Sequence, residues 1–74
     1  MLKNYYLVYC LDYAIIKERY FLCNGLEQAC ELAISHLLKD DDHFFNRVKV
    51  YRCKQGAPTG SPVIIETDSS VKNE

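Results

Sequence analysis

The segment YYLVYCLDYAIIKERYFLCNG, residues 5–25, decides the fold because it contains two strand-like runs separated by a short polar break. Residues 3–11 are rich in Tyr, Leu and Val, and residues 14–23 are rich in Ile, Tyr, Phe and Leu. Aromatic and β-branched residues are enriched in strands. Because Asp12 and Tyr13 lie between the two runs, the segment predicts a β-hairpin with a two-residue turn.

The register of this hairpin assigns its side chains to two faces, because side chains alternate along a strand. With Asp12 and Tyr13 as the turn, one face is expected to contain Tyr5, Leu7, Tyr9, Leu11, Ile16, Glu18, Tyr20 and Leu22. The opposite face is then expected to contain Tyr6, Val8, Cys10, Ile15, Lys17, Arg19, Phe21 and Cys23.

The next segment, NGLEQACELAISHLLKD at residues 24–40, predicts a helix with its start signal in place. Asn24 is a favourable N-cap, and Glu27 is placed to complete a capping box. Aspartates follow at 40–42, where the helix dipole disfavours negative charge, so the helix is expected to end near Lys39 and the aspartates to form a solvated helix end. One apolar stripe is formed by Leu26, Ala29, Cys30, Ala33, Ile34 and Leu37.

The C-terminal third predicts two further strands. Residues 47–53, RVKVYRC, alternate and place Val48 and Val50 on one face, with Lys49 and Tyr51 on the other. The segment KQGAPTGSP contains two of the three glycines and both prolines, which predicts a long mobile loop before a short final strand, VIIET.

The chain therefore predicts a single α+β domain over residues 1–67, in which one helix packs on one face of a small, mainly antiparallel sheet in the order β-β-α-β-β. Its 74 residues leave room for one hydrophobic core. Residues 68–74 are polar and are expected to form a flexible C-terminal tail, since they have little apolar surface to offset the entropy of ordering.

Charge and hydropathy exclude several classes of protein. A formal net charge of −1 is not that of a protein that coats nucleic acid by bulk charge. No apolar stretch reaches the length of a membrane span, and MLKNYY lacks the features of a secretory signal. We therefore expect a cytoplasmic protein with no membrane partner.

The four cysteines are predicted to serve packing rather than chemistry. No C-x-x-C pair occurs among Cys10, Cys23, Cys30 and Cys53, so the spacing is poor for a zinc site. Free cysteine behaves as a small hydrophobic residue. We expect no metal site and no cofactor. No paired catalytic carboxylates, nucleophile elbow or phosphate-cradling loop is evident either, so we expect no enzymatic activity.

One helix can cover only one side of the sheet, so the other side meets water or a partner. In the register above, the uncovered side is rich in aromatic and basic residues, which are enriched in interfaces. The strand cations also have a purely structural interpretation, in which they discourage edge pairing and cover apolar surface. The predicted binding residues are Tyr6, Lys17, Arg19, Phe21, Lys49 and Tyr51.

Three functions fit such a face. The first is a protein-binding module, with a larger protein or a second copy of the chain as partner. The second is a single-stranded nucleic-acid-binding or regulatory protein, in which aromatic rings stack on bases and cations contact phosphates, although no RNP-type string is present. The third is a homodimeric structural protein.

The pattern YYLVYC … YFLCNGLEQACELAISHL … VKVYRC … PVIIE, which covers residues 5–66, resembles small β-β-α-β-β proteins common among bacteriophage and mobile-element genes. Some of these proteins are anti-CRISPR or other anti-defence inhibitors. The resemblance implies a non-catalytic protein that acts in the host cytoplasm and blocks a larger host complex, such as a CRISPR effector, by surface contact. It implies no particular functional residue.

Overall fold

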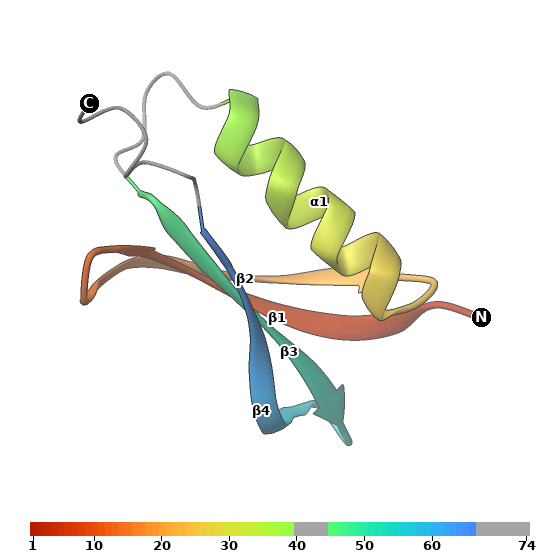
Figure 1. Ribbon diagram of the computed structural model, residues 1–74. Coiled ribbons are helices and arrows are strands. Elements are labelled where there is room, and N and C mark those ends of the chain that lie inside the picture. Colours follow the sequence, from red (N-terminus) through yellow and green to blue (C-terminus); the bar gives the residue numbers. More distant parts are fainter. Residues whose placement is uncertain (40–44, 67–74) are drawn as a thin grey trace.

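A computed structural model describes residues 1–39 and 45–66. It confirms the predicted α+β fold: one helix lies on a four-stranded antiparallel sheet whose strand order is β2-β1-β3-β4 (Figure 1). The predictions for the aspartates at 40–42 and for the tail at 68–74 lie outside the described residues. The elements are β1 (Lys3–Leu11), β2 (Ala14–Cys23), α1 (Leu26–Lys39), β3 (Arg47–Lys54) and β4 (Ala57–Glu66).

The core lies between α1 and one side of the sheet, with the central strand β1 as its main contributor. Leu7 of β1 is fully buried, as are Ala29 and Ala33 of α1. The hydroxyl of Tyr9 is hydrogen-bonded to Nδ1 of His36 at 2.6 Å, so this buried ring keeps a polar partner. The buried cluster consists of Tyr5, Leu7, Tyr9, Cys23, Ala29, Ala33, Val48 and Val50.

The register of β2 differs from the predicted one because the strand contains a bulge. Leu11 pairs with Ala14 and Cys10 with Ile15, as predicted, but Tyr9 pairs with Lys17 and leaves Ile16 as the extra residue. A one-residue slip moves every later side chain to the opposite face. The face prediction for residues 17–23 is therefore wrong: Lys17, Arg19, Phe21 and Cys23 share the helix side with Tyr5, Leu7 and Tyr9.

The start of α1 also differs in detail from the prediction. The first helical hydrogen bond runs from the Ala29 N–H to the Gly25 carbonyl at 3.1 Å, so Gly25 rather than Asn24 is the N-cap. The Asn24 N–H donates to Oε1 of Gln28 at 2.5 Å, so Gln28 does what was expected of Glu27. The helix ends at Lys39, as predicted.

The predicted loop before the last strand is wrong, because β4 begins at Ala57 and the turn is only Gln55 and Gly56. Both turn residues have positive φ, 55° and 83°, which is the type I′ conformation that matches strand twist. Proline is tolerated in β4 because β4 is an edge strand. The pairing of β3 with β4 is irregular between the pairs Val50–Val63 and Arg52–Thr59. The β4 residues 60–62, which include Gly60 with a φ of 72°, lie in this irregular part.

The four cysteines occupy packing positions, as predicted. All are free thiols; Cys10 and Cys23 are buried, and Cys30 and Cys53 are partly buried. Removal from water raises the pKa of the Cys23, Cys30 and Cys53 thiols, which keeps them protonated and poorly nucleophilic. Residues 1–39 and 45–66 contain no helix long and apolar enough to cross a membrane.

Candidate functional site

The side of the sheet opposite α1 presents a row of three tyrosines that crosses three adjacent strands. Tyr6 of β1 pairs with Tyr20 of β2 on one side and with Tyr51 of β3 on the other. The Tyr6 ring centroid lies 4.8 Å from that of Tyr20 and 5.7 Å from that of Tyr51, within the range of favourable aromatic pairs. We call this surface the tyrosine face; it comprises Tyr6, Val8, Glu18, Tyr20, Leu22, Lys49, Tyr51 and Ile64.

Apolar side chains surround the row. Tyr20, Leu22 and Ile64 are 51%, 62% and 52% exposed, so the face offers apolar area to a partner as well as aromatic rings. Val8, between Glu18 and Lys49 in the ladder, is buried at the base of the face. Several exposed apolar side chains on one face of a sheet are typical of interaction sites.

Glu18 raises the pKa of Tyr6, the central tyrosine of the row. Its carboxylate accepts a hydrogen bond from the Tyr6 hydroxyl, and this bond, together with partial removal from water and the negative charge of Glu18, raises the pKa of Tyr6 to about 12. Tyr6 is therefore neutral, and a donor, throughout the physiological range.

Replacement of Glu18 by Gln is expected to lower the pKa of Tyr6 from about 12 toward its ordinary value of 10, because the charged acceptor is lost. The raised pKa stabilises the fold fully below pH 10, and this contribution is lost as the pH rises toward 12. An NMR titration of the tyrosine ring carbons measures the shift. Tyr9 is the internal control, since burial raises its pKa to about 12 without Glu18; an unchanged Tyr6 pKa would contradict the assignment.

The structure divides the six predicted binding residues into two groups. Tyr6, Lys49 and Tyr51 lie together on the tyrosine face, as predicted. The other three, on the helix side of β2, do not join them.

Each of these three β2 side chains has contacts away from the tyrosine face. Nζ of Lys17 lies 5.0 Å from the centre of the Tyr9 ring, and Phe21 packs against the core. Arg19 donates a hydrogen bond to the Glu18 carbonyl at 2.8 Å. The predicted placement of Lys17, Arg19 and Phe21 on the uncovered face is thus wrong, and the bulge at Ile16 is the cause.

Sequence reasoning missed Glu18, Tyr20 and Leu22 as members of the face. One sequence signal points to another register: Asp12-Tyr13 is not the Asn-Gly type of turn that two-residue hairpin loops favour. Asp12 adopts a φ of 57°, in the left-handed region that Asp tolerates better than most residues.

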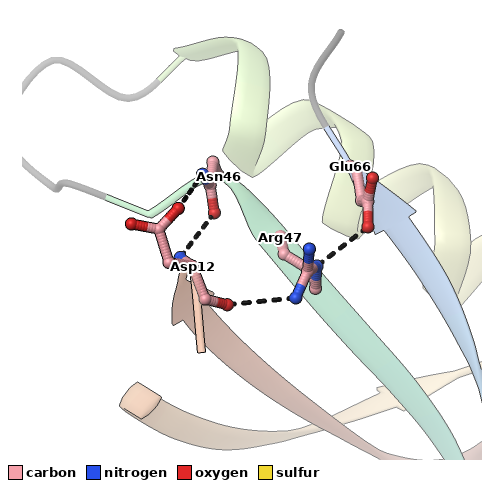
Figure 2. A network of polar contacts seen from close by, with 4 residues as sticks. All are labelled: Asp12, Asn46, Arg47 and Glu66. Carbon is pink, nitrogen blue, oxygen red and sulfur yellow. Dashed lines mark hydrogen bonds and ion pairs between the residues drawn. The ribbon is translucent and has the colours of Figure 1, made fainter. Parts of the chain in front are cut away.

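A polar network of Asp12, Asn46, Arg47 and Glu66 fixes one end of the sheet (Figure 2). The Asp12 N–H donates to Oδ1 of Asn46 at 3.1 Å, and Nδ2 of Asn46 donates back to the Asp12 carboxylate at 3.3 Å. Arg47 donates to the Asp12 carbonyl through Nη1 at 3.0 Å and to the Glu66 carboxylate through Nε at 2.9 Å. The network joins the tip of the β1–β2 hairpin to β3 and to the end of β4.

Opposite charges on the uncovered side of the sheet balance each other. Arg47 is paired with Glu66, and the negative charge of Glu18 lies across β1 from the positive charge of Lys49. Since Lys17 and Arg19 project to the other side, the tyrosine face is close to neutral rather than basic.

Two shallow depressions, of about 480 and 120 Å³, lie at the start of α1 and beside Lys3 and Arg52, and neither is lined by the tyrosine row. Residues 1–39 and 45–66 contain no group of three or more His, Cys, Asp or Glu side chains placed to hold a metal ion.

No family model, curated protein or solved structure matches the chain.

Proposed function

We propose that the protein is a small non-catalytic protein-binding module and that the tyrosine face is its binding surface. The observation that carries the proposal is the packed row of Tyr20, Tyr6 and Tyr51 on the side of the sheet that α1 leaves uncovered. Tyrosine supplies a large, rigid contact area at low entropic cost and is enriched in interfaces. Here the rings hold one another in place before any partner arrives.

The charge of the face favours a protein over a nucleic acid as partner. Single-stranded nucleic-acid platforms combine stacking aromatics with cations that follow the phosphates. On the tyrosine face, the negative charge of Glu18 balances the positive charge of Lys49. Arg47, on the neighbouring part of β3, forms an ion pair with Glu66. An exposed apolar rim around a neutral aromatic row suits a protein surface better. An inhibitor that docks on a larger host complex, as the phage and mobile-element resemblance implies, would use such a surface.

The test is capture of a partner by the tagged protein, compared with the double variant Tyr51→Ala, Lys49→Glu. We expect the variant to bind at least about 30-fold more weakly, because loss of one aromatic anchor typically costs about 2 kcal/mol. The matched control is Ile34→Ser, Leu38→Ser on α1, where both side chains are exposed on an element that lies across the sheet from the tyrosine face. This control is expected to retain binding.

Two results would overturn the proposal. The first is full partner binding by the tyrosine-face variant, with its fold confirmed by circular dichroism. The second is that the captured partner is a nucleic acid, for which the affinity would fall log-linearly with salt concentration.

A further inference from the structure

The two edges of the sheet differ in how well they are protected from pairing. Edge strand β4 contains Pro58 and Pro62 and an irregular register around Gly60, all of which hinder the addition of another strand. Edge strand β2 contains neither proline nor glycine, and among the described residues no strand lies beyond it. The backbone of β2 is therefore the better template for a further strand.

The bulge limits the regular part of β2 to the run from Lys17 to Cys23. Before this run the strand is irregular at Ile16, and after it the chain turns into α1. The midpoint of the run is Tyr20. An antiparallel pair of two such runs, related by a two-fold axis, uses its full length only when the axis passes through Tyr20.

Charge excludes three other registers and is compatible with the one centred on Tyr20. When two β2 strands pair so that the two sheets join into one, residues opposite each other must face the same side of the sheet. The two-fold axis therefore lies between two copies of the same residue. An axis at Lys17, Glu18 or Arg19 would place identical charges directly opposite each other, which is destabilising. The axis at Tyr20 places Tyr20 opposite Tyr20, Arg19 opposite Phe21, Glu18 opposite Leu22 and Lys17 opposite Cys23.

We propose that the protein forms a symmetric homodimer in which the β2 strands of two copies pair antiparallel, centred on Tyr20. The two sheets become one, both helices lie on the same side, and the two tyrosine faces join on the other. The row then runs through Tyr51, Tyr6 and Tyr20 of one protomer and continues through the same residues of its partner. The proposal does not rest on the proposed function; it doubles the aromatic surface that such a function would use.

The test is the oligomeric state of the full chain, measured by sedimentation equilibrium over a range of concentrations. We expect a reversible dimer whose dissociation constant rises at least about tenfold in Tyr20→Lys, because two like charges then meet on the axis and the ring pair is lost. The matched control is Tyr51→Lys, which makes the same exchange on an inner strand and is expected to leave the dimer intact.

A cysteine pair gives a second readout if Tyr20→Lys does not fold. Under mild oxidation, Tyr20→Cys is expected to form a disulfide-linked dimer, since the two thiols lie opposite each other across the axis. Leu22→Cys lies opposite Glu18 instead and is expected to cross-link no more than the native chain. A monomer at every concentration, a Tyr20→Lys dimer of native affinity, or equal cross-linking by both cysteine variants would overturn the proposal. Partner capture is measured separately, so either proposal can fail alone.

Discussion

Replacement of Leu7 by Ala is expected to destabilise the protein by about 2–5 kcal/mol, as is typical of a large-to-small change at a fully buried site. Leu7 is 0% exposed and lies on the central strand, between Arg19 of β2 and Val50 of β3. Ala29 and Ala33 of α1 belong to the same buried cluster and have no longer side chains to fill the cavity. Because a domain of this size has only modest total stability, much of the variant population should be unfolded.

The matched control for this prediction is Leu22→Ala, which deletes the same atoms on the tyrosine face. Leu22 is 62% exposed at the edge of the sheet, so its replacement is expected to change the free energy of unfolding by no more than about 0.5 kcal/mol. Urea denaturation followed by circular dichroism measures both values. Equal losses in the two variants would contradict a main core that lies on the helix side of the sheet.

The second large effect is a difference in the free energy of unfolding between Phe21→Ala and Tyr20→Ala, two neighbouring aromatic positions in β2. Phe21→Ala is expected to cost about 2–3 kcal/mol, less than a fully buried ring because Phe21 is only partly buried against the core. The Phe21 ring centroid lies 5.6 Å from that of His36, so its loss opens the packing between β2 and α1. Tyr20→Ala removes a half-exposed ring and its contact with Tyr6, which is worth about 1 kcal/mol.

The order of these two effects tests the bulge. In the hairpin register without a bulge, Tyr20 would lie under the helix and Phe21 would face outward, so Tyr20→Ala would be the more damaging change. The measurement is again the free energy of unfolding from urea denaturation, in conditions where the protein is monomeric. A larger loss in Tyr20→Ala than in Phe21→Ala would rule out the register described above.

The fold class and the faces of β1 and β3 could be predicted from the sequence, because in each of these two strands only one assignment of side chains to the two faces suits a buried core. In β3, Val48 and Val50 alternate with Lys49 and Tyr51, so only one face is suited to the core. The helix followed from its apolar stripe and from the polar residues before it. These signals are local, which is why they could be read without coordinates.

The register of β2 could not be predicted, because both of its faces carry the same kinds of residue. Tyr20 and Leu22 on one face match Phe21 and Cys23 on the other, and charges at positions 17–19 occupy both. The alternation rule then gives two equal answers, and packing against α1 decides between them. Half of the predicted site was misplaced for this single reason.

The last strand is predicted from the sequence, but its first six residues, 57–62, are predicted as loop for a different physical reason. Glycine and proline favour a loop in sequence, but here Gly56 forms a two-residue turn, and Pro58 and Pro62 lie in an edge strand that does not need all of its N–H donors. Strand β4 can include these prolines only because it lies at the edge of the sheet, and the order of elements along the sequence does not tell which strands lie at the edges.

Nuclear Overhauser contacts across the β1–β2 hairpin test most directly whether the bulge at Ile16 places Tyr20 beside Tyr6 on the uncovered face. We expect backbone contacts between Tyr9 and Lys17 and ring contacts between Tyr6 and Tyr20. Backbone contacts that pair Tyr9 with Ile16 and Tyr6 with Arg19 would contradict this placement, because the tyrosine face would then lose its third ring.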